Sequence, residues 1–143
     1  MPAFRFRLEK VLGWQRTARD TEEFKLKQLN REMADGNAAL AQLRASRLAT
    51  ELEVRSFESL GGRDLAALAA YTERMEKREQ QQAEACRACA ERVAAQRTRW
   101  MEAQRRCQLL EKLKLRRRAD FNLQQDRQNE SLATELYLAG WPR

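Results

Sequence analysis

The sequence predicts an all-α fold: a long antiparallel two-helix coiled-coil hairpin in which the second helix extends beyond the first. Strong helix formers dominate the 143 residues, with Ala, Arg, Gln, Glu and Leu the most frequent. Proline occurs only at Pro2 and Pro142, so none breaks a helix in the interior. Charged residues make up 34% and aromatic residues 7%, which leaves little for a globular core. We therefore expect a single elongated coiled-coil domain over residues 1–143.

The first helix is predicted over about residues 8–59. Apolar residues alternate at spacings of three and four, which is the a/d pattern that faces a partner helix: Leu26, Leu29, Met33, Gly36, Leu40 and Leu43. Leu48, Leu52 and Phe57 continue the stripe after a shift in phase, as a stutter would produce. Gly36 keeps the phase, so we interpret it as a bend or a close helix approach rather than a turn.

The break between the helices is predicted at residues 60–64. Gly61 and Gly62 can adopt the left-handed conformation that ends a helix, and Asp64 is a favourable N-cap for the next one. The second helix is then expected over about residues 65–138.

The second helix carries its own a/d seam. It comprises Leu65, Leu68, Thr72, Met75, Glu79, Gln82, Cys86, Cys89, Val93, Gln96, Trp100, Ala103, Cys107 and Leu110. A turn at the paired glycines would place residue i opposite about residue 123 minus i, as in an antiparallel αα-hairpin. The second helix would then project roughly 30 Å beyond the start of the first.

The residue inventory argues against an enzyme and against a cofactor. The chain has no histidine, which is the commonest general base and metal ligand. Cys86, Cys89 and Cys107 invite a metal or redox interpretation, but a structural zinc site needs four ligands. All three fall on the predicted seam, where a thiol packs as a small apolar group. We predict packing, with no metal and no small-molecule substrate.

The sequence contains no apolar run long enough for a secretory signal or a membrane span. We expect a cytoplasmic protein with reduced thiols and no direct membrane insertion.

Positive charge gathers near both termini. Residues 97–118 hold nine Lys and Arg against two Glu, and residues 1–27 hold seven against four acidic residues. Hairpin pairing would bring these segments together, whereas residues 51–64 at the turn carry a net −2. A basic face can be a solvated surface, a nucleic-acid site or a surface for an acidic protein. Nucleic-acid motifs are absent, and polarised charge favours steering towards an acidic protein.

Several segments together resemble the FliJ family of coiled-coil proteins of the bacterial flagellar type III export apparatus. The opening Phe4-Arg5-Phe6-Arg7-Leu8-Glu9-Lys10-Val11-Leu12 resembles the start of that family. Similar motifs follow at residues 68–77, at Arg99-Trp100, at residues 110–118 and at residues 126–130. Members often end this tail with an Asp-Glu pair where this chain has Thr134-Glu135.

The resemblance implies a non-enzymatic stalk, similar to the rotor subunit of rotary ATPases. The end with both termini would enter the hexameric flagellar export ATPase through basic residues: Arg5, Arg7, Lys10, Arg16, Lys112, Lys114, Arg116, Arg117, Arg118 and Arg127. The tip would contact the cytoplasmic domain of the export gate through Phe57, Leu68, Tyr71 and Met75.

The same resemblance implies links to export chaperones and a peripheral position at the inner-membrane export apparatus. Two alternatives stay open: the equivalent stalk of an injectisome type III secretion system, and a basic coiled coil that binds nucleic acid.

Overall fold

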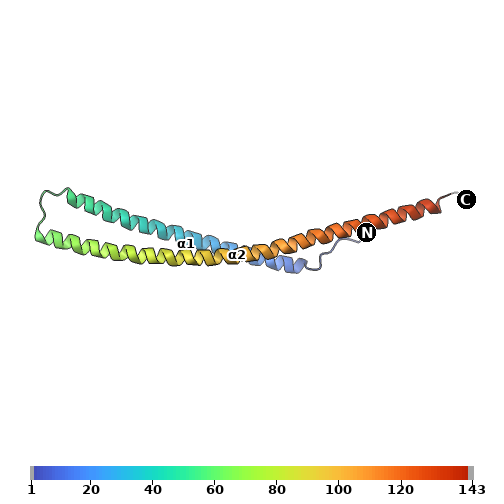
Figure 1. Cartoon of the computed structure of the whole chain (residues 1–143), viewed down its shortest axis with the longest axis horizontal. Helices are drawn as coiled ribbons and strands as arrows, with labels where there is room; N and C mark the ends of the chain where they lie inside the picture. Colours follow the sequence, from blue (N-terminus) through green and yellow to red (C-terminus); the bar gives the residue numbers. More distant parts are fainter. Residues whose placement is uncertain (1, 142–143) are drawn as a thin grey trace. The chain divides into compact units, whose positions relative to one another are not determined.

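The computed structural model describes residues 2–141, and its regular structure consists of two long helices packed against each other. Helix α1 (Glu9–Arg55) has 47 residues and helix α2 (Gly62–Ala139) has 78 (Figure 1). The predicted all-α fold with a longer second helix is therefore confirmed. The chain divides into two compact units, which we call the hairpin unit (Glu22–Arg99) and the terminal unit (Met1–Thr21 with Trp100–Arg143).

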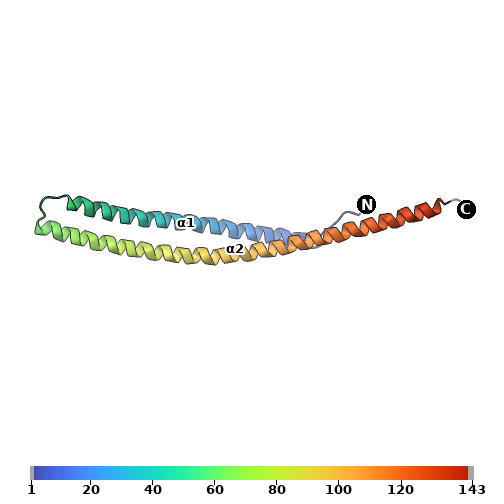
Figure 2. The ribbon, with the colours of Figure 1, turned by 45° about the horizontal axis from the view of Figure 1, so that its top comes forward.

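Within the hairpin unit, α1 and α2 run antiparallel on either side of a short loop, as the ribbons show from two directions (Figures 1 and 2). Near the loop, the hydroxyls of Thr50 and Tyr71 lie 3.2 Å apart. Far from the loop, the Gln96 amide donates to the Glu22 carbonyl oxygen at 3.1 Å and also to the Glu22 carboxylate. The predicted pairing would place residue 101 opposite Glu22, five residues further along α2 than the observed Gln96. The predicted register is therefore offset by about one and a half helical turns at this point.

The predicted a/d seam of α2 is confirmed. Every buried residue of this helix among the described residues is a member of it: Met75, Cys89, Val93, Gln96, Ala103 and Cys107. The six seam positions predicted in α1 between Leu26 and Leu43 are all half-buried. Gln82 Nε2 donates to the Gly36 carbonyl oxygen at 3.0 Å, so Gly36 is a close approach between the helices, as expected.

The predicted stutter at the end of α1 is wrong. Leu48 and Leu52 are more than half exposed, whereas Arg47, Thr50 and Val54 keep the original phase and are half-buried. Polar contacts explain the difference, because the Arg47 guanidinium lies 3.1 Å from the Glu79 carboxylate and Thr50 bonds Tyr71. The seam therefore continues without a phase shift but with polar residues.

Helix α1 ends at Arg55, four residues before the predicted end at Ser59. The amides of Ser56 and Phe57 donate to the carbonyl oxygens of Glu53 and Val54, both at 3.1 Å. The Ser56 hydroxyl donates to the Glu53 oxygen as well, at 2.6 Å. These short-range bonds tighten the last turn and satisfy its carbonyl groups, so the helix stops before it reaches the glycines.

Helix α2 begins at Gly62, three residues before the predicted start at Leu65. The Leu65 amide donates to the Gly61 carbonyl oxygen at 3.1 Å, so Gly61 takes the N-cap position. Asp64 was predicted to be the N-cap, but it is the third residue of the helix (N3). Its carboxylate accepts a hydrogen bond from the Gly61 amide at 3.2 Å, as the N3 side chain does in a capping box. No described glycine has a positive φ, so the expected left-handed glycine is also wrong.

In the terminal unit, α1 and α2 pack through small and medium apolar side chains. Leu12 and Cys107 are completely buried, and Ala103 is 3% exposed. The first residue of α1, Glu9, pairs with Lys114 through both carboxylate oxygens at 2.9 and 3.0 Å. Helix α2 continues for a further 25 residues, and the predicted extension of α2 beyond the start of α1 is therefore present.

The first part of this extension is covered on one side by the N-terminal segment. The non-helical N-terminal segment, residues 2–8, lies along α2 between Leu113 and Arg127 (Figure 2). The rings of Phe4 and Phe121 are 5.7 Å apart and tilted by 51°. From Arg127 to Trp141, every residue is exposed.

Candidate protein-binding surfaces

The two units differ sharply in charge. The terminal unit holds fourteen Lys and Arg against eight Asp and Glu, a net +6. The hairpin unit holds fourteen against thirteen, a net +1. Nearly all of the chain's +7 therefore lies in the terminal unit, which agrees with the basic end predicted from the sequence.

The terminal unit contains a groove between the N-terminal segment and α2, with a volume of about 1040 Å³. We call it the N-terminal groove. Its apolar lining includes Phe4, Phe6, Leu8, Leu113, Phe121 and Leu123. Its charged lining includes Arg5, Arg7, Arg117 and Arg127, with Asp120 as the acidic member. A concave surface that combines apolar side chains with a few convergent charges is typical of a binding site.

The structure places six of the ten predicted basic residues in two neighbouring grooves. Arg5, Arg7, Arg117 and Arg127 line the N-terminal groove, and Arg5, Lys114 and Arg118 line a smaller groove beside it. Arg16 is half-buried and its guanidinium lies 3.4 Å from the Glu111 carboxylate, so this side chain and Lys114 also hold the two helices together.

The remaining predicted basic residues, Lys10, Lys112 and Arg116, are exposed but line neither groove. They contribute to the charge of the terminal unit without forming part of a concave site.

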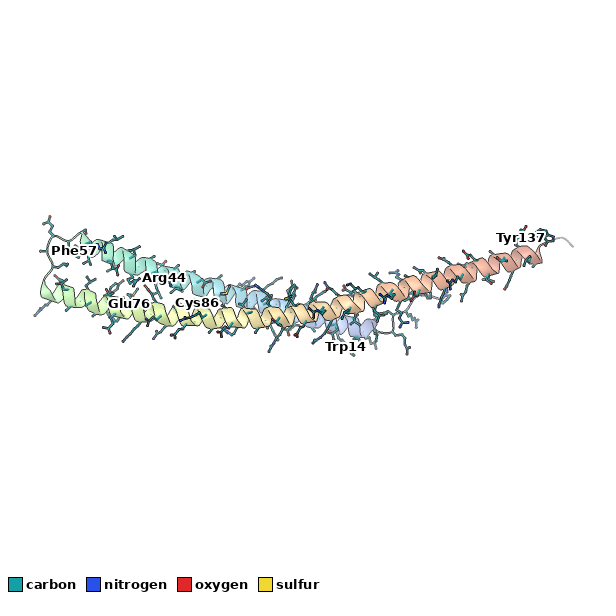
Figure 3. The ribbon with its side chains drawn as sticks, viewed as in Figure 1. Trp14, Arg44, Phe57, Glu76, Cys86 and Tyr137 are labelled. Carbon is teal, nitrogen blue, oxygen red and sulfur yellow. The ribbon has the colours of Figure 1, made fainter. Side chains whose placement is uncertain are left out.

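The four predicted tip residues are not equivalent. Phe57 lies in the loop and is 53% exposed (Figure 3). Leu68 and Tyr71 are half-buried, and Met75 is buried at 6% exposure in the interhelical core. Met75 therefore stabilises the hairpin and offers little surface to a partner.

Sequence reasoning missed two groups of surface residues. Leu48 and Leu52 were assigned to the seam but lie one turn apart on the exposed face of α1. Phe4 and Phe121 were not assigned to a site, yet their contact forms part of the N-terminal groove. The aromatic opening motif was the available signal for Phe4, whereas nothing local indicates that Phe121 faces it.

The cysteines pack between the helices as predicted and do not cluster with one another. Cys89 and Cys107 are buried on the seam, and Cys86 is half-buried beside Gly36 (Figure 3). The Cys89 thiol lies 3.7 Å from the Leu29 carbonyl oxygen. Within residues 2–141, no cluster of three or more His, Cys, Asp or Glu side chains is arranged to hold a metal ion.

Fold and surface together define a class: a two-helix coiled-coil protein with a basic, partly apolar surface in its terminal unit. The family described as "Flagellar FliJ protein" has a sequence model that matches residues 4–136. The chain belongs to the FliJ family, a family of non-catalytic coiled-coil components associated with flagellar export.

Of the two secretion systems that the sequence left open, this match is to the flagellar one. Comparisons with curated proteins and with solved structures give no match. Among the described residues, neither helix contains a stretch long and apolar enough to cross a membrane.

Proposed function

We propose that this protein is a stalk of the flagellar export apparatus that binds inside the ring of the hexameric export ATPase through its terminal unit. The single observation that carries the proposal is the concentration of a net +6 in that unit, in a chain of the FliJ family. A strongly basic surface raises the rate of association with an acidic partner and fixes its orientation.

The proposed mechanism contains no chemical step by this chain. A helix pair inside a ring touches the ring subunits unequally, because its surface is not symmetric. It shifts the subunits towards one conformation only if it binds that conformation more tightly than the others. The stalk would thereby promote ring assembly or ATP hydrolysis, while the ATPase supplies the catalytic groups.

We further propose that the loop end of the hairpin unit contacts the cytoplasmic domain of the export gate, with links to export chaperones. Exposed Phe57 supports this contact, since clustered exposed apolar side chains mark interaction sites. Leu48 and Leu52 add exposed apolar surface on α1 towards the same loop. This role requires no membrane insertion, only association with an apparatus at the inner membrane.

The proposal is tested by adding the purified protein to its cognate export ATPase and measuring ATP hydrolysis and ring formation. We expect both to rise with the wild-type chain and to fall back with the triple variant Arg116→Glu, Arg117→Glu, Arg118→Glu. A matched control reverses three exposed arginines of the hairpin unit, Arg87, Arg97 and Arg99, and should retain most of the stimulation.

The stalk role fails if the wild-type chain changes neither hydrolysis nor ring formation. The assignment to the terminal unit fails if both triple variants lose stimulation equally. Swimming motility of cells carrying each variant provides a second readout in the intact apparatus.

A further inference from the structure

The arginines of the N-terminal groove are not neutralised by the chain itself. Arg5, Arg7, Arg117 and Arg127 take part in none of the ion pairs found within residues 2–141. All four side chains are exposed. Elsewhere in the terminal unit, Arg16 and Lys114 have carboxylate partners, whereas Lys10, Lys112 and Arg116 take part in none of these ion pairs but line no groove. The groove is therefore where unpaired cations and apolar side chains lie together.

The floor of the groove is apolar and shaped by aromatic rings. Phe4, Phe6 and Phe121 are each half-buried, and Phe4 and Phe121 contact each other. Their burial accounts for the position of the N-terminal segment along α2, but the rings keep part of their surface in the groove. An apolar side chain of a ligand could therefore be removed from water here, at roughly 25 cal/mol per Å² buried.

The N-terminal segment also has backbone groups to offer. Within the described residues, two backbone hydrogen bonds outside the helix interiors involve this segment. The Glu9 amide donates to the Phe6 carbonyl oxygen, and the Leu12 amide donates to the Leu8 carbonyl oxygen. The amides of Ala3, Phe4 and Arg5 donate to no backbone acceptor within residues 2–141. A peptide lying along the segment could accept hydrogen bonds from them.

We propose that the N-terminal groove binds an acidic peptide segment that carries a leucine or aromatic side chain between its carboxylates. The apolar side chain packs against Phe6 and Phe121, and the carboxylates pair with the four arginines, whose planar guanidinium groups match carboxylate geometry. This inference rests on the proposed function, because it names the chemistry of the segment through which the export ATPase would engage the basic unit.

The groove favours a peptide over a nucleic acid for two reasons. Single-strand binders use open aromatic platforms on which bases stack, whereas Phe4 and Phe121 are half-buried against each other. Asp120 also lies in the groove, where it would repel a continuous run of phosphates but can receive a backbone amide of a peptide.

The experiment measures fluorescence anisotropy of a labelled ten-residue peptide of alternating glutamate and leucine with one central phenylalanine, added to the full-length chain. We expect binding that weakens as salt is raised, since exposed ion pairs are screened. A peptide with glutamine in place of glutamate should bind to the wild-type chain at least about tenfold more weakly. The glutamate peptide should show the same loss of affinity for the double variant Arg117→Glu, Arg127→Glu.

A matched double variant of the hairpin unit, Arg97→Glu with Arg99→Glu, should bind the peptide as the wild type does. The variant Phe121→Ala should also weaken binding while circular dichroism shows unchanged helix content. A single-stranded oligonucleotide should not displace the peptide at equal concentration.

The inference is overturned if the glutamate and glutamine peptides bind equally, if the groove variants bind the peptide as tightly as the wild type, or if the oligonucleotide outcompetes it. Stimulation of the ATPase is measured on the same variants. If the groove variants lose peptide binding but still stimulate the ATPase, the groove is not the contact with the ATPase, and the stalk role stands. If the wild-type chain binds the peptide but does not stimulate the ATPase, the groove stands as a peptide site and the stalk role is rejected.

Discussion

The two units solve the same packing problem with different side chains. In addition to buried apolar residues such as Val93, the hairpin unit holds its helices together with polar contacts along the seam, such as Gln96 with Glu22 and Arg47 with Glu79. The terminal unit buries Leu12, Ala103 and Cys107 almost completely, and the ion pairs that join its helices are partly exposed. The fourteen Lys and Arg of the hairpin unit are matched in number by thirteen acidic residues, whereas the terminal unit keeps a net +6 that is available to a partner.

The largest expected effect on stability comes from truncating Leu12, the completely buried leucine of the terminal unit. Because Leu12 is completely buried, we expect Leu12→Ala to lower the free energy of unfolding by about 2–4 kcal/mol. Urea unfolding followed by circular dichroism measures the change. Leu109→Ala truncates a leucine of the same unit that is 62% exposed and should change stability by less than about 0.5 kcal/mol. Equal losses for both variants would mean that the terminal unit has no apolar core.

A smaller effect is expected from the polar seam of the hairpin unit. Gln96 is 6% exposed and donates to both the carbonyl group and the carboxylate of Glu22. Gln96→Ala should lower the free energy of unfolding by about 1–3 kcal/mol, because it removes both hydrogen bonds between the helices and most of a buried side chain. The exposed Gln80→Ala serves as the control and should be neutral within about 0.5 kcal/mol. If Gln96→Ala is also neutral, the polar seam does not stabilise this unit.

The smallest effect has the opposite sign and can be compared between the units. A Cβ at Gly36 would lie 3.4 Å from the Cys86 sulfur, an ordinary contact, and a Cβ at Gly13 would meet nothing within 4 Å. Both glycines lie inside α1, so Gly→Ala should stabilise each unit by up to about 1 kcal/mol through helix propensity. Thermal unfolding of the two variants gives the comparison. A loss of stability for Gly36→Ala alone would show that the helices need the glycine for their close approach.

The sequence predicted the seam wherever apolar residues mark it, and failed where polar residues do. From Leu26 to Leu43 the heptad spacing located the interface correctly. Beyond Leu43, the apolar residues Leu48 and Leu52 were assigned to the seam, whereas Arg47 and Thr50 in fact face the other helix. The partners of Arg47 and Thr50 lie on α2, so the spacing within α1 does not indicate them. Long-range pairs of this kind are invisible to a periodicity argument.

The candidate site could be predicted in its charge but not in its shape. Composition was enough to place the basic end, since charge is additive along the chain. The N-terminal groove depends on a non-helical segment, residues 2–8, packing beside Phe121. A segment without periodicity carries no register signal, so its position on α2 could not be derived. The helix ends were misplaced by up to four residues for a similar reason, because capping by Asp64 and Ser56 involves specific hydrogen bonds.

The polar contacts of the hairpin unit have one more consequence, which concerns sliding rather than stability. If α2 slipped by one heptad along α1, Gln96 would be replaced opposite Glu22 by Cys89 or Ala103. Ala103 has no donor and the Cys89 thiol has a single weak one, so neither can replace the two hydrogen bonds that the amide of Gln96 makes. Polar seam positions are known to select one register in this way. A shift of one helix against the other by seven residues, in either direction, therefore loses this contact.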